Sequence, residues 1–287
     1  MLTPVEDHGG IYYKRDDMFC PYGDVNGGKV RQTRLLFSKY VCPPGGWRGV
    51  VAAVSVYSPT GPVISRVAKS YGISCIIAVG GTTPENLDKL PMMKLTKHFG
   101  AEVRIVAGHG MKNAITARVN EICKETGYHN IDFSHHIYSD ADLMFDTNAE
   151  QVQNIPDELD NLIIPTGVAI QTTGILIGLK RYNKKVKRIV CVCVGPTREK
   201  KIDGYFKDVY EDDVKNYHPF EMVAHKAPYS KSFNFEIEGE YMDDIYEGKA
   251  YDWLLKNIDY QNEKTMMWLV GKRPRTEDVD YMMENKL

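Results

Sequence analysis

The chain has 287 residues, of which 43% are apolar and 26% are charged. This composition is typical of a globular protein with a buried core, and it excludes a disordered chain. The formal net charge of −2 argues against strong unspecific attraction to nucleic acids or to anionic membranes.

Apolar runs of strand type alternate with helical patterns along most of the chain. In chain order we expect a helix at 30–40, a strand at 50–54, a helix at 62–71, a strand at 74–79, a helix at 87–99, a strand at 102–106, helices at 113–125 and 141–152, a strand at 161–165, a helix at 172–182 and a strand at 188–194. This order predicts a parallel sheet covered by helices on both faces, with ligands bound beyond the carboxyl ends of the strands. Residues 203–240 show no clear pattern, and we expect them to be mostly loop.

The first candidate functional residues precede the helix expected at 30–40. Tyr13-Lys14-Arg15-Asp16-Asp17 is followed by Asn26-Gly27-Gly28-Lys29-Val30-Arg31. Two glycines before a lysine let the backbone bend and bring the amine close to a flat ligand. A helix start and the neighbouring Arg31 both disfavour the charged ammonium, which leaves the free amine that attacks an aldehyde. A surface lysine at a helix start is the plainer interpretation of these residues alone.

Three further segments contain residue types that bind anions or carry protons. Residues 55–61 place hydroxyls and backbone N–H groups at a helix start, although an ordinary turn has the same composition. Residues 163–174 contain Gly167 and Gly174 around another helix start, which is a weak phosphate motif by itself. Residues 243–250 contain Tyr246 and Glu247 at the start of an amphipathic helix, where an acidic residue also suits the helix dipole.

Taken in order, these four segments resemble the signature of fold-type II pyridoxal-phosphate (PLP) enzymes. Lys-Arg-Asp-Asp followed by Gly-Gly-Lys is most similar to the branch that contains 1-aminocyclopropane-1-carboxylate (ACC) deaminase and D-cysteine desulfhydrase. The resemblance implies an α/β fold with two lobes, each a mostly parallel sheet flanked by helices. Residues 1–39 and 146–287 would form the large PLP-binding lobe, and residues 40–145 an inserted small lobe. We also expect a homodimer.

The resemblance assigns the attachment of the cofactor and the binding of the substrate to two segments. Lys29 matches the lysine that carries PLP as a Schiff base, although the asparagine beside it stands two places earlier than in relatives. Ser58, Thr60 and Gly61 match the loop that holds the substrate carboxylate. In that loop Pro59 replaces the asparagine that reaches the ring oxygen of the cofactor, and proline has no N–H donor.

The other two segments match the phosphate loop and the wall beside the pyridine ring. The resemblance implies that the cofactor phosphate contacts Gly167, Ala169, Ile170, Gln171 and Thr172, where Ala169 and Ile170 stand at positions that are glycine in relatives. Tyr246 matches a tyrosine that faces the substrate, and Glu247 matches a glutamate at the pyridine nitrogen. A carboxylate there keeps the nitrogen protonated and makes the ring a stronger electron sink. We therefore expect Lys29, Tyr246 and Glu247 to be catalytic.

These assignments predict a PLP-dependent lyase that acts at the α carbon of a small amino-acid-like substrate, as a deaminase or desulfhydrase does. The altered loop at Pro59 motivates an α-decarboxylase as the alternative, because that enzyme must hold the carboxylate out of the ring plane. Shortened relatives of this kind resemble phage enzymes of DNA modification, so the alternative substrate is a glycyl-modified thymine in DNA. A second alternative, from the altered phosphate loop, is a non-catalytic PLP-binding or amino-acid-binding protein.

Partners and location follow from weaker signals. No apolar run reaches the length of a membrane span and no signal peptide begins the chain, so we expect a cytoplasmic protein, in the host cytoplasm if it is viral. The basic residues between Lys180 and Arg188 are most simply a solvated helix end, with a DNA contact as the alternative. His135-His136 has no thiol or carboxylate at ligand spacing, so no metal is expected.

Overall fold

The computed structural model describes residues 1–284, except for the side chains of residues 112, 134 and 135. Contacts divide the chain into two compact units. The first unit comprises Met1–Phe19 and Ile137–Arg273, and the second comprises Cys20–His136 and Pro274–Leu287. Residues 20–39 and 274–284, which the sequence-based division places in the large lobe, therefore group with the second unit, and residues 137–145 group with the first.

The first unit is built on a six-stranded sheet in the order β1-β2-β12-β7-β8-β9. The strands are β1 (Val5–His8), β2 (Ile11–Arg15), β7 (Glu158–Thr166), β8 (Lys185–Cys193), β9 (Glu221–Ala224) and β12 (Thr265–Leu269). Only β1 is antiparallel to its neighbour, so the other five strands end at the same edge of the sheet. A hairpin of β10 (Glu236–Ile237) and β11 (Glu240–Tyr241) lies outside this sheet.

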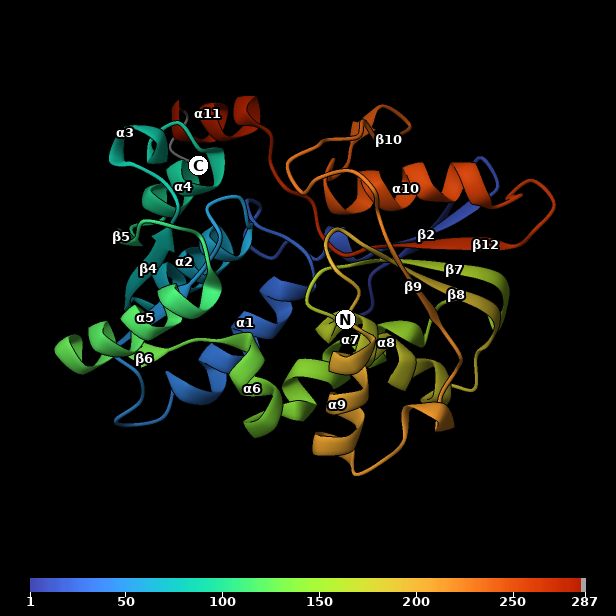
Figure 1. Ribbon diagram of the computed structural model, residues 1–287, viewed down its shortest axis with the longest axis horizontal. Coiled ribbons are helices and arrows are strands. Elements are labelled where there is room, and N and C mark those ends of the chain that lie inside the picture. Colours follow the sequence, from blue (N-terminus) through green and yellow to red (C-terminus); the bar gives the residue numbers. More distant parts are fainter. Residues whose placement is uncertain (285–287) are drawn as a thin grey trace. The chain divides into compact units, whose positions relative to one another are not determined.

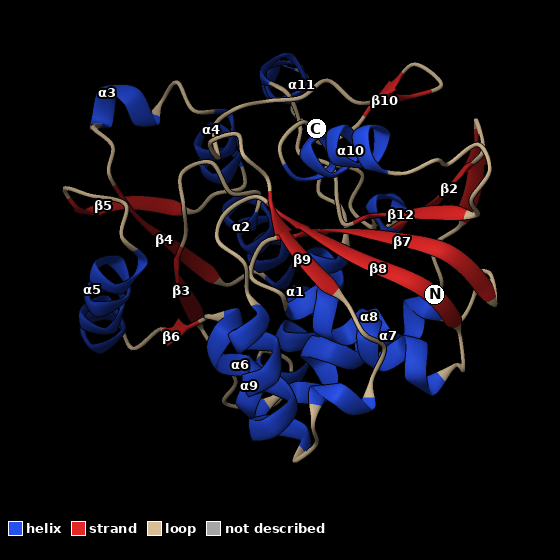
Figure 2. Ribbon diagram, turned by 45° about the vertical axis from the view of Figure 1, so that its right-hand side comes forward, coloured by secondary structure: helices blue, strands red, loops and turns tan. Residues whose placement is uncertain are grey.

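Helices cover both faces of this sheet, as Figures 1 and 2 show. On one face, α10 (Tyr246–Asn257) packs its buried Ala250 and Leu254 against Ile163, Val190 and Met267 of the strands. On the other face lie η2 (Asp142–Asp146), α7 (Thr147–Ala149), η3 (Glu150–Val152), α8 (Ile170–Arg181) and α9 (Glu199–Tyr210), while η1 (Asp16–Met18) and η4 (Val214–Asn216) are short turns.

The second unit is built on a parallel four-stranded sheet in the order β5-β4-β3-β6. Its elements are α1 (Gly28–Tyr40), β3 (Gly49–Ala53), α2 (Thr60–Tyr71), β4 (Ser74–Gly80), α3 (Pro84–Leu87), α4 (Pro91–His98), β5 (Glu102–Ala107), α5 (Lys112–Thr126), β6 (His129–Asn130) and α11 (Thr276–Glu284), and α6 (Phe133–Ser139) spans the boundary between the units. Val51 and Ile76 pack against Val119 of α5, and their sequence neighbours face the opposite way, where α2 contacts β4.

The predicted α/β class, with sheets rich in parallel strands, is confirmed. Two expected helices differ in detail. The helix expected at 87–99 is divided, because Pro91 begins α4 and holds Leu90 in an extended conformation. The helix expected at 141–152 changes its hydrogen-bond spacing along its length, from the π-helical turn η2 to the 3-10 turn η3.

The prediction of a mostly irregular 203–240 segment is wrong in part. Its beginning belongs to the amphipathic helix α9, and β9 adds a sixth strand to the sheet of the first unit. A short strand such as β9 has too few residues to show an alternating pattern, so only its pairing with β8 reveals it.

Candidate active site

Lys29 lies in the first turn of α1, directly after a turn that needs glycine. Gly27 has φ of 89°, a left-handed conformation that side chains rarely adopt. The half-buried Lys29 amine donates a hydrogen bond to Oγ1 of Thr60 at 3.0 Å. The carbonyl of Lys29 accepts from Oγ1 of Thr33 at 2.7 Å. Hydrogen bonds therefore hold Lys29 both at its side-chain amine and at its main-chain carbonyl.

The loop before α2 collects the hydroxyls that the sequence predicted. Oγ of Ser58 donates to Oγ1 of Thr60 at 2.9 Å and accepts from the Thr60 N–H at 3.2 Å. At Gly61 a Cβ would lie 2.9 Å from Oγ1 of Thr96, so a side chain there would displace this helix start. Lys29, Ser58 and Thr60 thus form one hydrogen-bonded chain within the second unit.

The loop between β7 and α8 keeps a glycine-like shape without the inner glycines. Ala169 precedes α8 with φ of 70°, so its backbone adopts the conformation that glycine adopts freely. No side chain caps α8 and no acidic residue lies in its first turn, which leaves the backbone N–H groups of Ile170 and its successors available to an anion.

The side chains after Ala169 are bonded inside the protein. Nε2 of Gln171 donates to Oδ2 of Asp16 at 3.3 Å, and Oγ1 of Thr172 lies 3.0 Å from Oγ1 of Thr166. Gly174 has a packing role, because a Cβ there would meet the Phe145 carbonyl oxygen at 2.5 Å. Anion binding in this loop would therefore rest on main-chain donors more than on side chains.

Glu247 is a fully buried carboxyl group in the first unit, and only one of its two oxygens accepts hydrogen bonds. Its side chain is buried, with 1% of the residue exposed, and Oε1 accepts from the N–H groups of Val270 at 2.8 Å and of Gly271 at 3.2 Å. Oε2 is buried and has no hydrogen-bond partner among the described residues. Burial raises the pKa of Glu247 well above its ordinary range, and the negative charge of Asp243 raises it further. The carboxyl group can therefore hold a proton, which it can share with the neighbouring carboxyl of Asp243 or with a ligand at Oε2.

Tyr246 begins α10 and lies beside the β7–α8 loop. A Cβ at Gly167 would be 3.0 Å from Cε1 of Tyr246, so the missing side chain makes room for this ring. The hydroxyl of Tyr246 lies 3.3 Å from that of Tyr229. Burial raises the pKa of both tyrosines, so both hydroxyls stay protonated and remain donors. Gly167, Tyr246 and Glu247 thus gather around the start of α10.

Sequence reasoning missed three residues that hold this group together. Oδ1 of Asp243 accepts from the N–H groups of Ile245 at 2.9 Å and Tyr246 at 2.6 Å, which fixes the start of α10. The buried Lys249 donates to the carbonyl of Tyr229 at 2.9 Å. Asp243 and Lys249 lie in the segment that was recognised, but no local pattern marks Tyr229, which is brought in only by folding.

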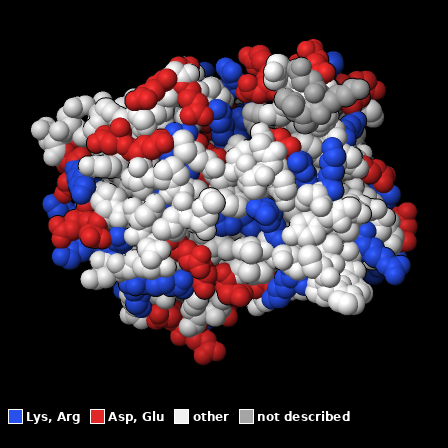
Figure 3. Space-filling model, turned by 180° about the vertical axis from the view of Figure 1, so that it is seen from behind, with Lys and Arg blue, Asp and Glu red and all other residues white. Residues whose placement is uncertain are grey.

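The basic residues between Lys180 and Arg188 are each paired with a carboxylate. The partners are Lys180–Asp212 (3.6 Å), Arg181–Asp146 (2.6 Å), Lys184–Asp157 (2.7 Å), Lys185–Glu158 (2.9 Å), Lys187–Asp160 (2.6 Å) and Arg188–Glu221 (2.6 Å). This pairing argues against a DNA contact. The expected solvated helix end is found only at Lys180 and Arg181, because Lys185, Lys187 and Arg188 lie in β8 and Lys184 is buried. Figure 3 shows acidic and basic side chains similarly interspersed over one face of the molecule.

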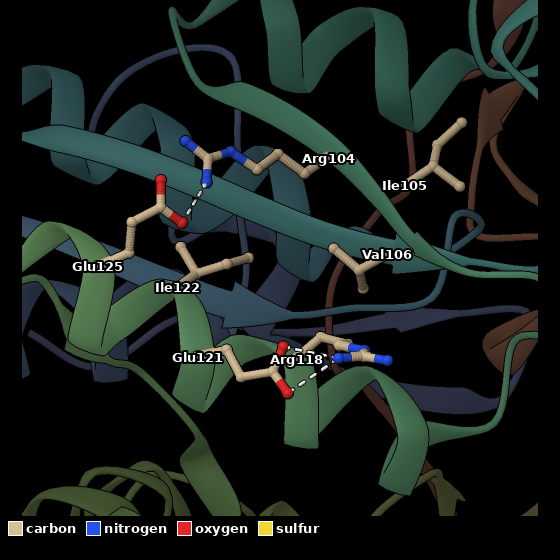
Figure 4. A pocket seen from close by; sticks show the side chains of 7 residues that line it. All are labelled: Arg104, Ile105, Val106, Arg118, Glu121, Ile122 and Glu125. Atoms are coloured by element: carbon tan, nitrogen blue, oxygen red, sulfur yellow. Dashed lines mark hydrogen bonds and ion pairs between the residues drawn. The ribbon is translucent and has the colours of Figure 1, made fainter.

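A surface groove of about 500 Å³ lies between β5 and α5, and none of the predicted site residues lines it (Figure 4). Ile105, Val106 and Ile122 line it together with four charged residues. The charged side chains pair with one another, Arg104 with Glu125 at 3.7 Å and Arg118 with Glu121 at 2.7 Å. The groove therefore offers no unpaired charge to a substrate.

Within residues 1–284 no helix is long and apolar enough to cross a membrane. Among the side chains that the structure describes, no group of three histidines, cysteines or carboxylates is arranged to hold a metal ion. The side chain of His135 lies outside this description. His136 packs against the rings of Tyr40 and Trp47.

Comparison of the sequence with known proteins gives similarity to pyridoxal-phosphate dependent enzymes. A family model described as "Pyridoxal-phosphate dependent enzyme" matches residues 2–252. The O-seryl-dTMP PLP-dependent decarboxylase of Salmonella phage ViI is 24% identical over 347 aligned positions, covering 96% of this chain and 81% of that protein.

Solved structures show the same fold. An ACC deaminase homologue has a TM-score of 0.75 at 19% identity, covering all of this chain and 94% of the other. A hydrogen sulfide-producing enzyme from Fusobacterium nucleatum has a TM-score of 0.63 at 12% identity, covering 96% of both chains.

Proposed function

Because the chain belongs to the family of pyridoxal-phosphate dependent enzymes, we propose that it is an α-decarboxylase acting on an amino acid attached to thymine. The observation that carries this proposal is the similarity to the phage decarboxylase along 96% of the chain. The substrate loop supports it, because Pro59 replaces the asparagine of the deaminase-like relatives. In the proposed reaction the bond from the α carbon to the carboxyl carbon breaks, carbon dioxide leaves, and a proton takes its place.

The residues present fit PLP at three points. The α8 start has uncapped backbone N–H groups for the phosphate, shaped by the left-handed Ala169. Oε2 of Glu247 is buried and has no hydrogen-bond partner among the described residues. An atom that accepts a hydrogen bond from the pyridine N–H would be left in this state before the cofactor binds. The Lys29 amine is half-buried and oriented by Thr60. We propose that these three groups hold the cofactor.

When bound, PLP supplies an electron sink for the bond that breaks at the α carbon. Lys29 would exchange protons with the α carbon through Nζ, and Oγ1 of Thr60 would hold that amine in place. Ser58 and Thr60 would orient the substrate carboxylate through their hydroxyls. Glu247 would share one proton with the pyridine nitrogen through Oε2, and burial and Asp243, which both raise its pKa, help to keep that proton in the site. Tyr246 would donate a hydrogen bond from its hydroxyl to the substrate.

The test is to incubate the purified holoenzyme with O-seryl-dTMP or glycyl-modified dTMP and to follow both carbon dioxide release and product mass. We expect loss of the carboxyl group and retention of the amine. Lys29→Ala should abolish turnover, and borohydride reduction of the wild type should fix the cofactor on Lys29. Release of ammonia or sulfide from free ACC or D-cysteine, with no reaction of the thymidylates, would reject the decarboxylase.

A deaminase-like lyase on a small free amino acid is the second candidate. The observation that favours it is the arrangement of Tyr246 and Glu247, whose segment resembles that of ACC deaminase, beside the hydroxyl of Tyr229. The same substrate panel separates the two candidates. No observation favours the non-catalytic binding protein. The homodimer stays a prediction, which light scattering of the holoenzyme tests.

A further inference from the structure

Tyr57 is a large aromatic side chain that the described part of the protein leaves without a partner. Its relative exposure is 47%, and its side chain makes no hydrogen bond, ion pair or ring contact with any described residue. Many other aromatic rings in the chain pack on neighbours; Trp47, for example, stacks on Tyr40 with ring centroids 4.6 Å apart. Apolar surface of this size gains free energy when a flat partner covers it.

The backbone that carries Tyr57 is fixed. The Ser58 N–H donates to the Ser55 carbonyl at 2.9 Å, which closes a turn with Tyr57 inside it. The Tyr57 N–H adds a bond to Oγ of Ser55 at 3.4 Å. Pro59, with φ of −67°, stiffens the connection from this turn to Thr60. A ring on such a turn is held ready, so a ligand that stacks on it loses little conformational entropy of the loop.

The position of this turn connects Tyr57 to the reactive amine. Thr60, which accepts the hydrogen bond of Lys29 at 3.0 Å, is three residues from Tyr57. Three residues of chain span at most roughly 11 Å. A substrate that reacts at the Lys29 amine and extends a nucleobase beyond its amino acid therefore has an aromatic platform within reach, all within the second unit.

Resting on the proposed function, we infer that Tyr57 is a specificity residue that stacks on the pyrimidine ring of the substrate. Every base has a π-face, and stacking on an aromatic side chain is a common way for proteins to bind unpaired bases. A substrate consisting of an amino acid alone has no flat ring to cover Tyr57. The ring of Tyr57 thus favours binding of a nucleobase-linked amino acid over a free amino acid, while Lys29 acts on the amino acid itself.

The experiment compares Tyr57→Phe, Tyr57→Leu and Tyr57→Ala in the holoenzyme. Tyr138→Ala is the matched control, since Tyr138 is 59% exposed and lies outside the candidate site. Binding of unmodified dTMP is measured by calorimetry, and KM and kcat are measured with O-seryl-dTMP. Tyr57→Ala should weaken dTMP binding and raise KM by roughly 5- to 150-fold, with kcat changed by less than about threefold. Phe should retain binding, Leu should be intermediate, and Tyr138→Ala should match the wild type.

The outcomes separate this inference from the proposed function. Unchanged dTMP affinity and KM in Tyr57→Ala overturn the stacking role even if the enzyme decarboxylates the thymidylate. A fall in kcat at constant KM, or loss of PLP from the variant, also overturns it, because either places Tyr57 in the machinery instead. If dTMP affinity falls as expected but no thymidylate adduct loses carbon dioxide, the inference stands and the decarboxylase does not.

Discussion

Two buried clusters of charge in the first unit differ in whether their polar atoms are satisfied within the chain. At the end of β2, the fully buried Lys14 amine donates to the Thr3 carbonyl and to Oδ1 of Asn154, both at 2.6 Å. Next to it, the Arg15 guanidinium binds Asp17 at 2.9 Å and Glu240 at 3.0 Å. At the start of α10, by contrast, the equally buried Glu247 satisfies one oxygen and leaves the other open.

This difference distinguishes buried charges that stabilise the fold from a buried group that is available to a ligand. A buried charge whose partners are all supplied by the chain fixes the fold, because removing either side leaves an unpaired group. A buried polar atom without a partner costs free energy in the unliganded protein, and where it lies among candidate site residues, as in Glu247, it points to a ligand. Lys14 and Arg15 belong to the most recognisable sequence motif, yet Glu247 carries the open atom.

The largest expected effect comes from Glu247→Gln. In the proposed site the amide could not hold the ring proton of the cofactor, so turnover should fall roughly 30- to 1000-fold, which corresponds to about 2–4 kcal/mol of barrier. PLP should stay bound, as its visible absorbance reports. Glu240→Gln is the control, since Glu240 is half-exposed and paired with Arg15 and Lys272. Unchanged single-turnover rates in Glu247→Gln would remove Glu247 from the chemistry.

Lys14→Met tests the other cluster. Methionine fills a similar volume but leaves Oδ1 of Asn154 without its donor, so the variant should lose about 1–3 kcal/mol of unfolding free energy. Each kcal/mol should lower Tm by roughly 2–4 °C. Turnover per folded molecule should match the wild type. A stable variant with impaired turnover would mean that Lys14 serves the reaction.

The pH dependence of stability should also distinguish Glu247. Its folded pKa is raised above the ordinary 4.5, so its stabilising contribution is present below that pH and is lost as the pH rises through the folded pKa. In cofactor-free protein, the advantage of Glu247→Gln over the wild type should therefore grow from about pH 4.5 upward. Urea unfolding across this range measures it. Glu158→Gln should show no such growth above pH 4.5, because the hydrogen bond with Lys185 lowers the pKa of Glu158; the stability that this pair contributes is lost only as the pH falls below about 4.5.

The smallest effects are expected at the basic residues between Lys180 and Arg188. Lys185→Gln breaks an exposed pair with Glu158 and should change stability by less than about 1 kcal/mol. If modified DNA binds, the salt dependence of its affinity should not change, whereas loss of one phosphate contact would reduce the slope by about 0.9. A reduced slope would show that pairing with carboxylates does not keep these cations from DNA.

Sequence order predicted the fold better than it predicted the contacts. The alternation of strands and helices depends on local periodicity, so the parallel sheets and the positions of Lys29 and Thr60 at helix starts follow from it. The hydrogen bond between these two residues joins segments 31 positions apart and needed the structure.

The surroundings of Glu247 were beyond local reasoning for a different reason. Its donors are main-chain N–H groups of Val270 and Gly271, and any residue except proline offers such a group. Tyr229 likewise comes from a segment without regular periodicity.

The left-handed backbone at Ala169 has an evolutionary consequence. An alanine there costs roughly 1–2 kcal/mol relative to a residue in a relaxed conformation, and the rest of the fold must absorb that cost. A lineage that can absorb it is free to replace glycines in the loop, since the direction of the N–H groups depends on torsion angles and not on side chains. A loop can therefore present the same backbone N–H groups without a recognisable glycine pattern.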